Sequence, residues 1–421
     1  MTSISFFSPN TAIRGVSRSI SLGSTKMKPL FISMTAVLFG SCSMMATAQT
    51  TDEELLELIR QQQAQIEALQ EVLEAQEKQI SENTIIATTA VEAIESTTST
   101  AASGRWYDRV SIGGYAEHHL NLLDDATDII DAHRYVLFIN NEFTDRLRFI
   151  SELELEHSIA GEGQPGEIEL EQAFIQFQYA ASHRVNIGQH LIPVGILNET
   201  HEPDTFYGVE RNRVETEVIP STWWETGLQF QGEISPGLTY DLGVHSGLFV
   251  ENFRIRSGRQ RSALATADDF AYTGRLKYTG VPGLEVAATL NYQTDITQST
   301  FDESAAAILY AAHVIYNSGD FGLRALYSGW QIDNDEFEAN GSDSPQGWYI
   351  EPSYKVTNEL GVFARYSEVD PARGDRPTQL TNQVDLGFNY WLHPQVVLKA
   401  DYQNNLEDGA DGFNLGVGWS F

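Results

Sequence analysis

The chain ends in the stretch Phe413-Asn414-Leu415-Gly416-Val417-Gly418-Trp419-Ser420-Phe421. Apolar side chains occupy every odd position, and polar side chains or glycine occupy every even position. Successive side chains of a β-strand point to opposite faces, so this pattern predicts a strand with one apolar face. The alternation continues to the final residue, Phe421.

The same period of two recurs upstream, from residue 105 onward. In residues 283–294 and 381–392, apolar side chains alternate with mostly polar ones, and near Gln172-Ala173 the phase breaks, which predicts a β-bulge. Aromatic residues fall near the predicted strand ends, as in an interfacial girdle: Trp224, Tyr278, Tyr316, Trp348, Tyr354, Trp391 and Trp419. The candidate strands are 108–121, 130–142, 145–157, 166–179, 183–190, 223–234, 237–247, 269–279, 283–294, 305–316, 320–332, 346–356, 359–369, 381–392, 395–404 and 412–421.

The lengths of the connections separate two all-β architectures. Every second connection is a tight turn, such as Phe143-Thr144, Ala180-Ala181-Ser182 and Asn317-Ser318-Gly319. The connections between them are mostly long and polar: 158–165, 191–222, 248–268, 295–304, 333–345 and 370–380. Short and long connections alternate in a transmembrane barrel but not in a Greek-key sandwich. The sequence therefore predicts an all-β transmembrane barrel of about 16 antiparallel strands over residues 105–421.

The composition excludes several other classes of protein. The 421 residues include 58 acidic and 26 basic residues, for a net charge of -32, which argues against nucleic acid as a partner. The single cysteine, Cys42, excludes a disulfide framework. Only residues 29–48 are apolar enough for a membrane helix, so a polytopic helical membrane protein is excluded.

No pattern in the sequence predicts catalysis, a metal site or a cofactor. HExxH and GxSxG motifs are absent, and the acidic pairs near Asp124 and Asp333 lack calcium-loop spacing. The histidines that an enzyme would need lie on separate predicted strands and loops: His118, His119, His157, His190, His201, His245 and His313. We therefore expect a protein that is not an enzyme.

The first 104 residues predict a leader and a tether. Residues 1–48 have the pattern of a signal peptide, with Met27 as an alternative start; a retained anchor and lipidation at Cys42 are the alternatives. Cleavage after Ala48 removes four basic residues and no acidic one, so the charge becomes -36. Residues 49–81 predict a short coiled coil, because apolar residues recur every seven positions, although a single amphipathic helix is the alternative. Residues 82–104 predict a flexible linker.

Two parts of the chain resemble known proteins. The last strand resembles the terminal signature of bacterial outer-membrane barrels, which implies that Trp419 and Phe421 form a signal for the barrel-assembly machinery. Residues 105–421 resemble the phosphate-selective porin O and P family, through the stretch 188–195, then Glu210-Arg211-Asn212-Arg213, then Trp224-Glu225-Thr226-Gly227. This resemblance implies a homotrimer in outer-membrane lipid, with passive diffusion of small solutes or ions and the N-terminal helix in the periplasm.

A barrel of sixteen strands leaves an aqueous lumen, which something must narrow. In trimeric porins the third external loop folds inward, and the longest connection here, 191–222, is the third. An external flap is the alternative. The charged residues predicted for the pore constriction are Glu199, His201, Glu202, Asp204, Glu210, Arg211, Arg213, Glu215 and Glu217.

The phase of the strands also predicts which charged side chains line the lumen: Arg134, Arg148, Glu152, Glu154, Arg184, Glu225, Arg275, Lys277, Arg324, Arg365, Asp385 and Lys399. A phosphate site needs clustered donors with few competing carboxylates. No lysine lies between Lys78 and Lys277, and inward carboxylates are many. The charges therefore favour a general or mildly cation-preferring porin. A phosphate-selective or anion-selective porin, or a barrel that serves as a structural anchor through its coiled coil, is the alternative.

Overall fold

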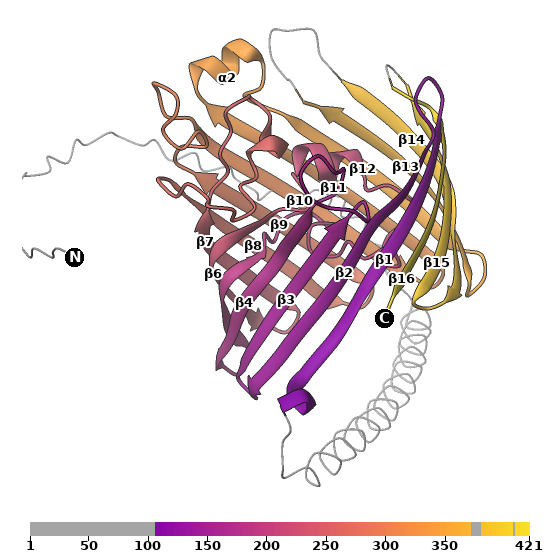
Figure 1. Ribbon diagram of the computed structural model, residues 1–421, viewed down its shortest axis with the longest axis horizontal. Coiled ribbons are helices and arrows are strands. Elements are labelled where there is room, and N and C mark those ends of the chain that lie inside the picture. The colour runs from indigo at the N-terminus through magenta and orange to yellow at the C-terminus, as the bar shows by residue number, and fades with distance from the viewer. Residues whose placement is uncertain (1–105, 372–379, 407–408) are drawn as a thin grey trace, which may run out of the picture. The chain divides into compact units, whose positions relative to one another are not determined.

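Sixteen strands form one closed antiparallel barrel in the part of the chain that the computed structural model describes, residues 106–371, 380–406 and 409–421 (Figure 1). Each strand pairs with its neighbours in sequence, and β1 also pairs with β16. The strands are β1 (Val110–Leu123), β2 (Ile129–Thr144), β3 (Leu147–Glu156), β4 (Ile168–Ala180), β5 (His183–Leu191), β6 (Trp224–Ser235), β7 (Leu238–Ser246), β8 (Phe270–Val281), β9 (Leu284–Gln293), β10 (Ala306–Ser318), β11 (Phe321–Asp333), β12 (Gln346–Lys355), β13 (Leu360–Asp370), β14 (Thr381–His393), β15 (Val396–Asn405) and β16 (Gly412–Ser420).

The orientation of the side chains is inverted relative to a water-soluble protein. On β14, the outward Leu386 is 54% exposed, whereas the inward Asp385 and Asn389 are almost fully buried. Apolar side chains therefore face outward and polar ones face inward, as expected for a barrel surrounded by lipid. The predicted barrel and its number of strands are confirmed.

The C-terminal residue closes the barrel. The backbone N–H of Phe421 donates to Gly114 O at 2.8 Å, and Gly114 N donates to Phe421 O at 3.0 Å. These two hydrogen bonds extend the pairing of β1 with β16 past the last strand residue. The first and last strands thus leave no open sheet edge.

Three details can be compared with the predicted strands. The bulge near Gln172-Ala173 is confirmed, because one extra residue, Glu171, separates the pairs Glu152–Gln172 and Leu153–Leu170. The turn predicted at Phe143-Thr144 is wrong by two residues, since pairing of β2 with β3 continues through Thr144. The girdle assignment of Trp224 is also wrong, because its side chain is buried beneath the Arg261 guanidinium.

Short helices occur outside the strands: η1 (Trp106–Arg109), η2 (Val214–Val218), η3 (Ile255–Gly258) and α2 (Asp335–Asn340). No helix within the described ranges is long and apolar enough to cross a membrane. The predicted signal peptide 1–48, coiled coil 49–81 and linker 82–104 lie outside the described residues and stay predictions.

An apolar cluster lies inside the barrel, where the sequence predicted an aqueous lumen. It consists of long connections packed against the inner faces of β10 to β13. Trp223, Leu248, Ile296 and Phe337 come from four different connections, and each is fully buried. These connections therefore fill the side of the barrel lined by β10 to β13.

Candidate functional site: a loop that crosses the lumen

The connection between β5 and β6, residues 192–223, folds into the barrel; we call it the inserted loop. Its first part turns inward at Gly195, whose φ of 70° is a conformation that favours glycine. A Cβ at this position would lie 2.5 Å from Glu215 Oε2. Residues 195 and 215 can therefore lie this close only because residue 195 is glycine. Gly195 lies within the stretch 188–195 that carries the family resemblance.

The middle of the inserted loop is attached by its backbone to the inner wall. Residues 205–209 offer four carbonyls and one N–H to five charged or polar side chains of four strands, β11 and β13 to β15. The pairs are Arg324 Nη2–Thr205 O at 2.7 Å, Asn389 Nδ2–Phe206 O at 2.9 Å, Arg365 Nη1–Tyr207 O at 3.3 Å, Lys399 Nζ–Gly208 O at 2.9 Å and Val209 N–Asp401 Oδ2 at 2.6 Å.

The charged side chains of the loop hold it on the opposite side. His201 lies between two carboxylates of the wall, with its Nε2 at 3.7 Å from Glu152 Oε1 and 3.4 Å from Glu171 Oε2. Glu171 is the bulge residue of β4, so the bulge brings a second carboxylate to this histidine. Burial and the Arg211 charge lower the His201 pKa, but the adjacent carboxylates of Glu152 and Glu171 outweigh them and raise it to about 9.

Glu210 makes a similar contact with the first strand. Its Oε1 lies 3.0 Å from both His119 Nδ1 and Asn121 Nδ2. Burial raises the Glu210 pKa, but the hydrogen bond and positive charge of His119 outweigh it and lower the pKa to about 2. The loop is therefore attached to β1 as well as to β3, β4 and the strands from β11 to β15.

A cavity of about 510 Å³ remains between the inserted loop and the inner faces of β1 to β4; we call it the loop-end chamber. Five carboxylates and five guanidinium groups line it. Glu156, Glu169 and Glu171 come from β3 and β4, whereas Arg256 and Arg259 come from the connection between β7 and β8. The chamber is thus polar, and the charges of these ten groups cancel.

The arginines of this chamber form a cluster that the sequence did not predict. Arg211 Nη1 donates to Thr222 Oγ1 and Arg259 Nη1 donates to Thr222 O, both at 2.6 Å, and Arg256 donates to the carbonyls of Thr216 and Ser221. Burial, followed by the charges of Arg259 and Arg211, lowers the Arg256 pKa to about 10. The basic spacing in Arg254-Ile255-Arg256-Ser257-Gly258-Arg259 is the signal in the sequence for this cluster, but the pattern of connections predicts only a long polar loop there.

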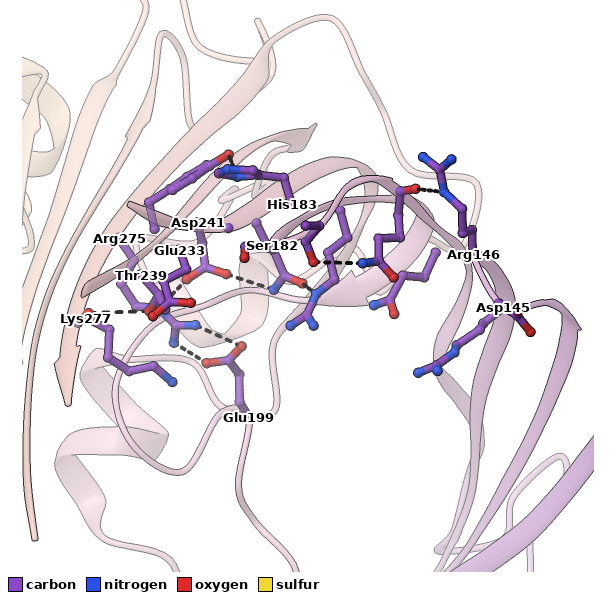
Figure 2. A pocket seen from close by; sticks show the side chains of 18 residues that line it. Asp145, Arg146, Ser182, His183, Glu199, Glu233, Thr239, Asp241, Arg275 and Lys277 are labelled. Carbon is purple, nitrogen blue, oxygen red and sulfur yellow. Dashed lines mark hydrogen bonds and ion pairs between the residues drawn. The ribbon is translucent and has the colours of Figure 1, made fainter. Parts of the chain in front are cut away.

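A second cavity, of about 470 Å³, lies at the end of the barrel with the tight turns; we call it the turn-end chamber (Figure 2). Arg148, Arg184, Arg275 and Lys277 line it together with Asp241. Glu199 of the inserted loop reaches into this chamber and pairs with Arg275 (Figure 2). Both chambers therefore border the inserted loop.

Most of the remaining predicted residues make hydrogen bonds or ion pairs within the barrel wall or the inserted loop. Glu215 is fully buried and accepts hydrogen bonds from Ile196 N, Leu197 N and Tyr349 Oη. Glu225 is buried against Trp223 Nε1 at 3.1 Å and Ser246 Oγ at 2.5 Å. Other predicted residues are paired within the wall or the loop: Arg134 with Glu117 and Glu154, Arg365 with Glu351 and Asp385, Arg213 with Glu217, and Asp204 with Ser420. Glu202 carries a buried Oε2 without a hydrogen-bond partner among the described residues.

Known proteins resemble this chain in sequence and in fold. The family described as Gram-negative porin matches residues 87–410, more than half of the chain. The chain belongs to the Gram-negative porin family. It is also similar to an uncharacterized protein of Aquifex aeolicus (strain VF5), with 29% identity over 359 residues, 74% of this chain and 80% of that protein.

Solved porins share the fold at low sequence identity. Salmonella typhi OmpF in complex with daunomycin matches with a TM-score of 0.57 and 14% identity, covering 74% of this chain and 97% of that one. The anion-selective porin from Comamonas acidovorans matches at 0.53 and 12%, covering 74% and 99%. The trimer form of OmpT from Vibrio cholerae matches at 0.53 and 13%, with the same coverage.

This porin is an outer-membrane channel for passive diffusion of solutes rather than an enzyme. Porins of this fold include trimeric forms. The resemblance to the phosphate-selective O and P family in particular is not confirmed.

Proposed function

We propose that the inserted loop forms the pore constriction and that solutes pass through the loop-end chamber. The observation that carries this proposal is the attachment of the loop to two sides of the barrel: residues 205–209 are bound to β11 and β13 to β15, and His201 and Glu210 contact β3, β4 and β1. Solutes then move between a carboxylate side, with Glu156 and Glu171, and an arginine side, with Arg256 and Arg259. Opposed charges in a narrow, low-dielectric passage orient dipolar solutes.

We further propose that this pore passes small hydrophilic solutes or ions of either sign. Equal numbers of carboxylates and guanidinium groups line the chamber, so neither sign dominates. A phosphate site would need clustered donors with few competing carboxylates. Here Glu169 already pairs with Arg261, and the other four carboxylates of the chamber face the same space.

One observation favours the phosphate-selective alternative. Arg211, Arg256 and Arg259 converge on the backbone of residues 216–222. The buried Nε and Nη2 of Arg211 have no hydrogen-bond partner among the described residues, so these donors are available to an anion. This cluster is the part of the pore at which phosphate would bind.

The test is the reversal potential in planar bilayers under KCl gradients, with and without millimolar phosphate. We expect weak selectivity and a chloride conductance that phosphate does not block. Glu156→Gln should shift the permeability ratio toward anions and Arg259→Gln toward cations, each by roughly twofold. Glu142→Gln is the matched control, because its carboxylate pairs with Arg148 outside the loop-end chamber. Block by phosphate would favour the alternative, and absence of conductance would refute the pore.

We also propose a homotrimer in outer-membrane lipid, assembled by the barrel-assembly machinery through Trp419 and Phe421. The tight turns then lie on the periplasmic side, because both ends of an even-stranded barrel lie there. Residues 49–81 form a periplasmic coiled coil that either holds the trimer together or tethers the barrel to a periplasmic partner, which is the anchoring alternative.

A further inference from the structure

Two histidines and an aspartate meet at the end of the barrel that carries the long connections. Asp131 and His133 belong to β2, and His157 directly follows β3. Asp131 Oδ2 lies 3.1 Å from His133 Nδ1 and 2.7 Å from His157 Nδ1. The two rings meet edge to face, with 5.7 Å between their centroids. Three potential metal-ligand atoms thus point to one place.

Two irregularities of the backbone bring these side chains together. The register of β1 against β2 shifts between Glu117 and His119. Next to this shift, His133 and Arg134 are neighbours in sequence, and both of their side chains line the loop-end chamber. The backbone N–H of His157 donates to His133 O at 3.1 Å, which sets the two histidines side by side. His157 has a φ of 51°, which is uncommon for a residue other than glycine.

We propose that Asp131, His133 and His157 bind a divalent transition-metal ion such as Zn²⁺ at the mouth of the pore. Imidazole nitrogen and carboxylate oxygen are the ligands that zinc takes in proteins, alone or with thiolate. Metal–ligand bonds of about 2.0–2.1 Å in a tetrahedral site place ligand atoms roughly 3.3 Å apart. The separations of Asp131 Oδ2 from His133 Nδ1 and His157 Nδ1, 3.1 and 2.7 Å, are shorter than this, so these side chains move apart when the ion binds.

The site is accessible, as binding of an ion from solution requires. The side chains of Asp131, His133 and His157 are 19%, 25% and 36% exposed. The other cluster of comparable composition, Glu152–Glu171–His201, is at most 3% exposed, and its geometry is that of a buried ion pair. Three protein ligands leave a fourth position for water, so the ion exchanges rather than serving as a permanent structural element.

Two carboxylates, Glu117 and Glu210, offset the positive charges of His119 and Arg134 beside the site. His119 stacks on His133, with 4.3 Å between ring centroids, and its two nitrogens face the carboxylates of Glu117 and Glu210. Arg134 is the nearest positive side chain on the same strand, and it is paired with Glu117 at 2.7 Å.

The test uses the full chain, purified in detergent without a histidine tag. We expect calorimetric titration with ZnCl₂ to give one saturable site per chain. His133→Gln and His157→Gln should each weaken binding by at least about tenfold. His313→Gln is the matched control, because His313 also faces one carboxylate, Glu285 at 3.0 Å, but is not part of a three-ligand cluster. Retained heat-modifiability on gels verifies that each variant is folded.

Conductance measurements distinguish a failure of the zinc site from a failure of the proposed pore. The zinc site rests on the proposed pore only because the ion must be able to reach it. Zn²⁺ should reduce the wild-type current and leave the current of the His133→Gln/His157→Gln double variant unchanged. Zinc binding that both single variants retain would place the ion elsewhere and overturn the inference, as would the absence of saturable binding. A wild-type protein that does not conduct in zinc-free KCl would instead refute the pore.

Discussion

At the scale of single residues, Glu215 holds the inserted loop in its folded shape. Its carboxylate accepts two backbone N–H groups of the loop, from Ile196 at 3.0 Å and Leu197 at 2.9 Å, and the Tyr349 hydroxyl at 2.9 Å. Glu215→Ala leaves three buried donors without an acceptor, and each such group costs about 1–3 kcal/mol. We expect a larger and noisier single-channel conductance and faster proteolysis within residues 192–223.

Glu217→Ala provides the control for this prediction from the same helix, η2. Glu217 pairs with Arg213 at 2.6 Å, but both side chains are about one-third exposed. An exposed pair of this kind contributes about 0.5 kcal/mol or less. Equal effects of the two substitutions on conductance and proteolysis would contradict the role assigned to Glu215.

At the scale of elements, the contact of the inserted loop with β3 and β4 depends on pH. His201 has a pKa of about 9 against an ordinary value of 6.5, a difference of about 3 kcal/mol in favour of the attached, protonated form. Because the folded-state pKa is raised, this stabilisation is complete below pH 6.5 and is lost as the pH rises through 9. We expect channel noise to increase between pH 7 and 10 in planar bilayers.

Two histidine variants test the source of this pH dependence. His201→Gln cannot take up the proton, so its noise should already be high at pH 6 and change little up to pH 10. His183→Gln should behave like the wild type, because His183 contacts Tyr240 at the turn end of the barrel and not the inserted loop. A wild-type channel whose noise is constant over this range would contradict the prediction.

At the scale of the whole molecule, the backbone of Phe421 takes part in closure of the barrel, and its ring is part of the proposed assembly signal. Phe421→Ala keeps both backbone hydrogen bonds with Gly114, whereas deletion of Phe421 removes them. We expect both variants to reach the outer membrane in smaller amounts in cells. In detergent refolding, Phe421→Ala should approach the wild-type yield. Wild-type levels of Phe421→Ala in the membrane would refute the assembly signal.

Deletion of residues 51–81 tests the role of the predicted coiled coil, again for the whole molecule. Loss of trimers on native gels, with folded barrels retained, is the result expected of an oligomerisation element. Trimers with wild-type conductance would show that the segment serves as a tether instead. Deletion of the linker segment 85–100, which removes a similar region without the heptads, is the control.

The chain's local pattern was sufficient to predict the barrel. Alternation along β14 and β16, the lengths of the connections and the terminal phenylalanine are properties of short segments, and strand pairing follows from them because the side-chain period is two. The bulge of β4 was also visible as a break in that period. The inserted loop was identified by its length and by the family resemblance.

Only the tertiary structure decided what meets inside the lumen. Arg256 joins Arg211, and His157 joins Asp131 and His133, although these partners lie in different connections or strands. The path of the inserted loop depends on apolar contacts among several connections, which no single segment reveals. Period-two alternation fixes which face a side chain occupies, whereas its partner across the lumen depends on strand register, bulges and closure of the whole barrel.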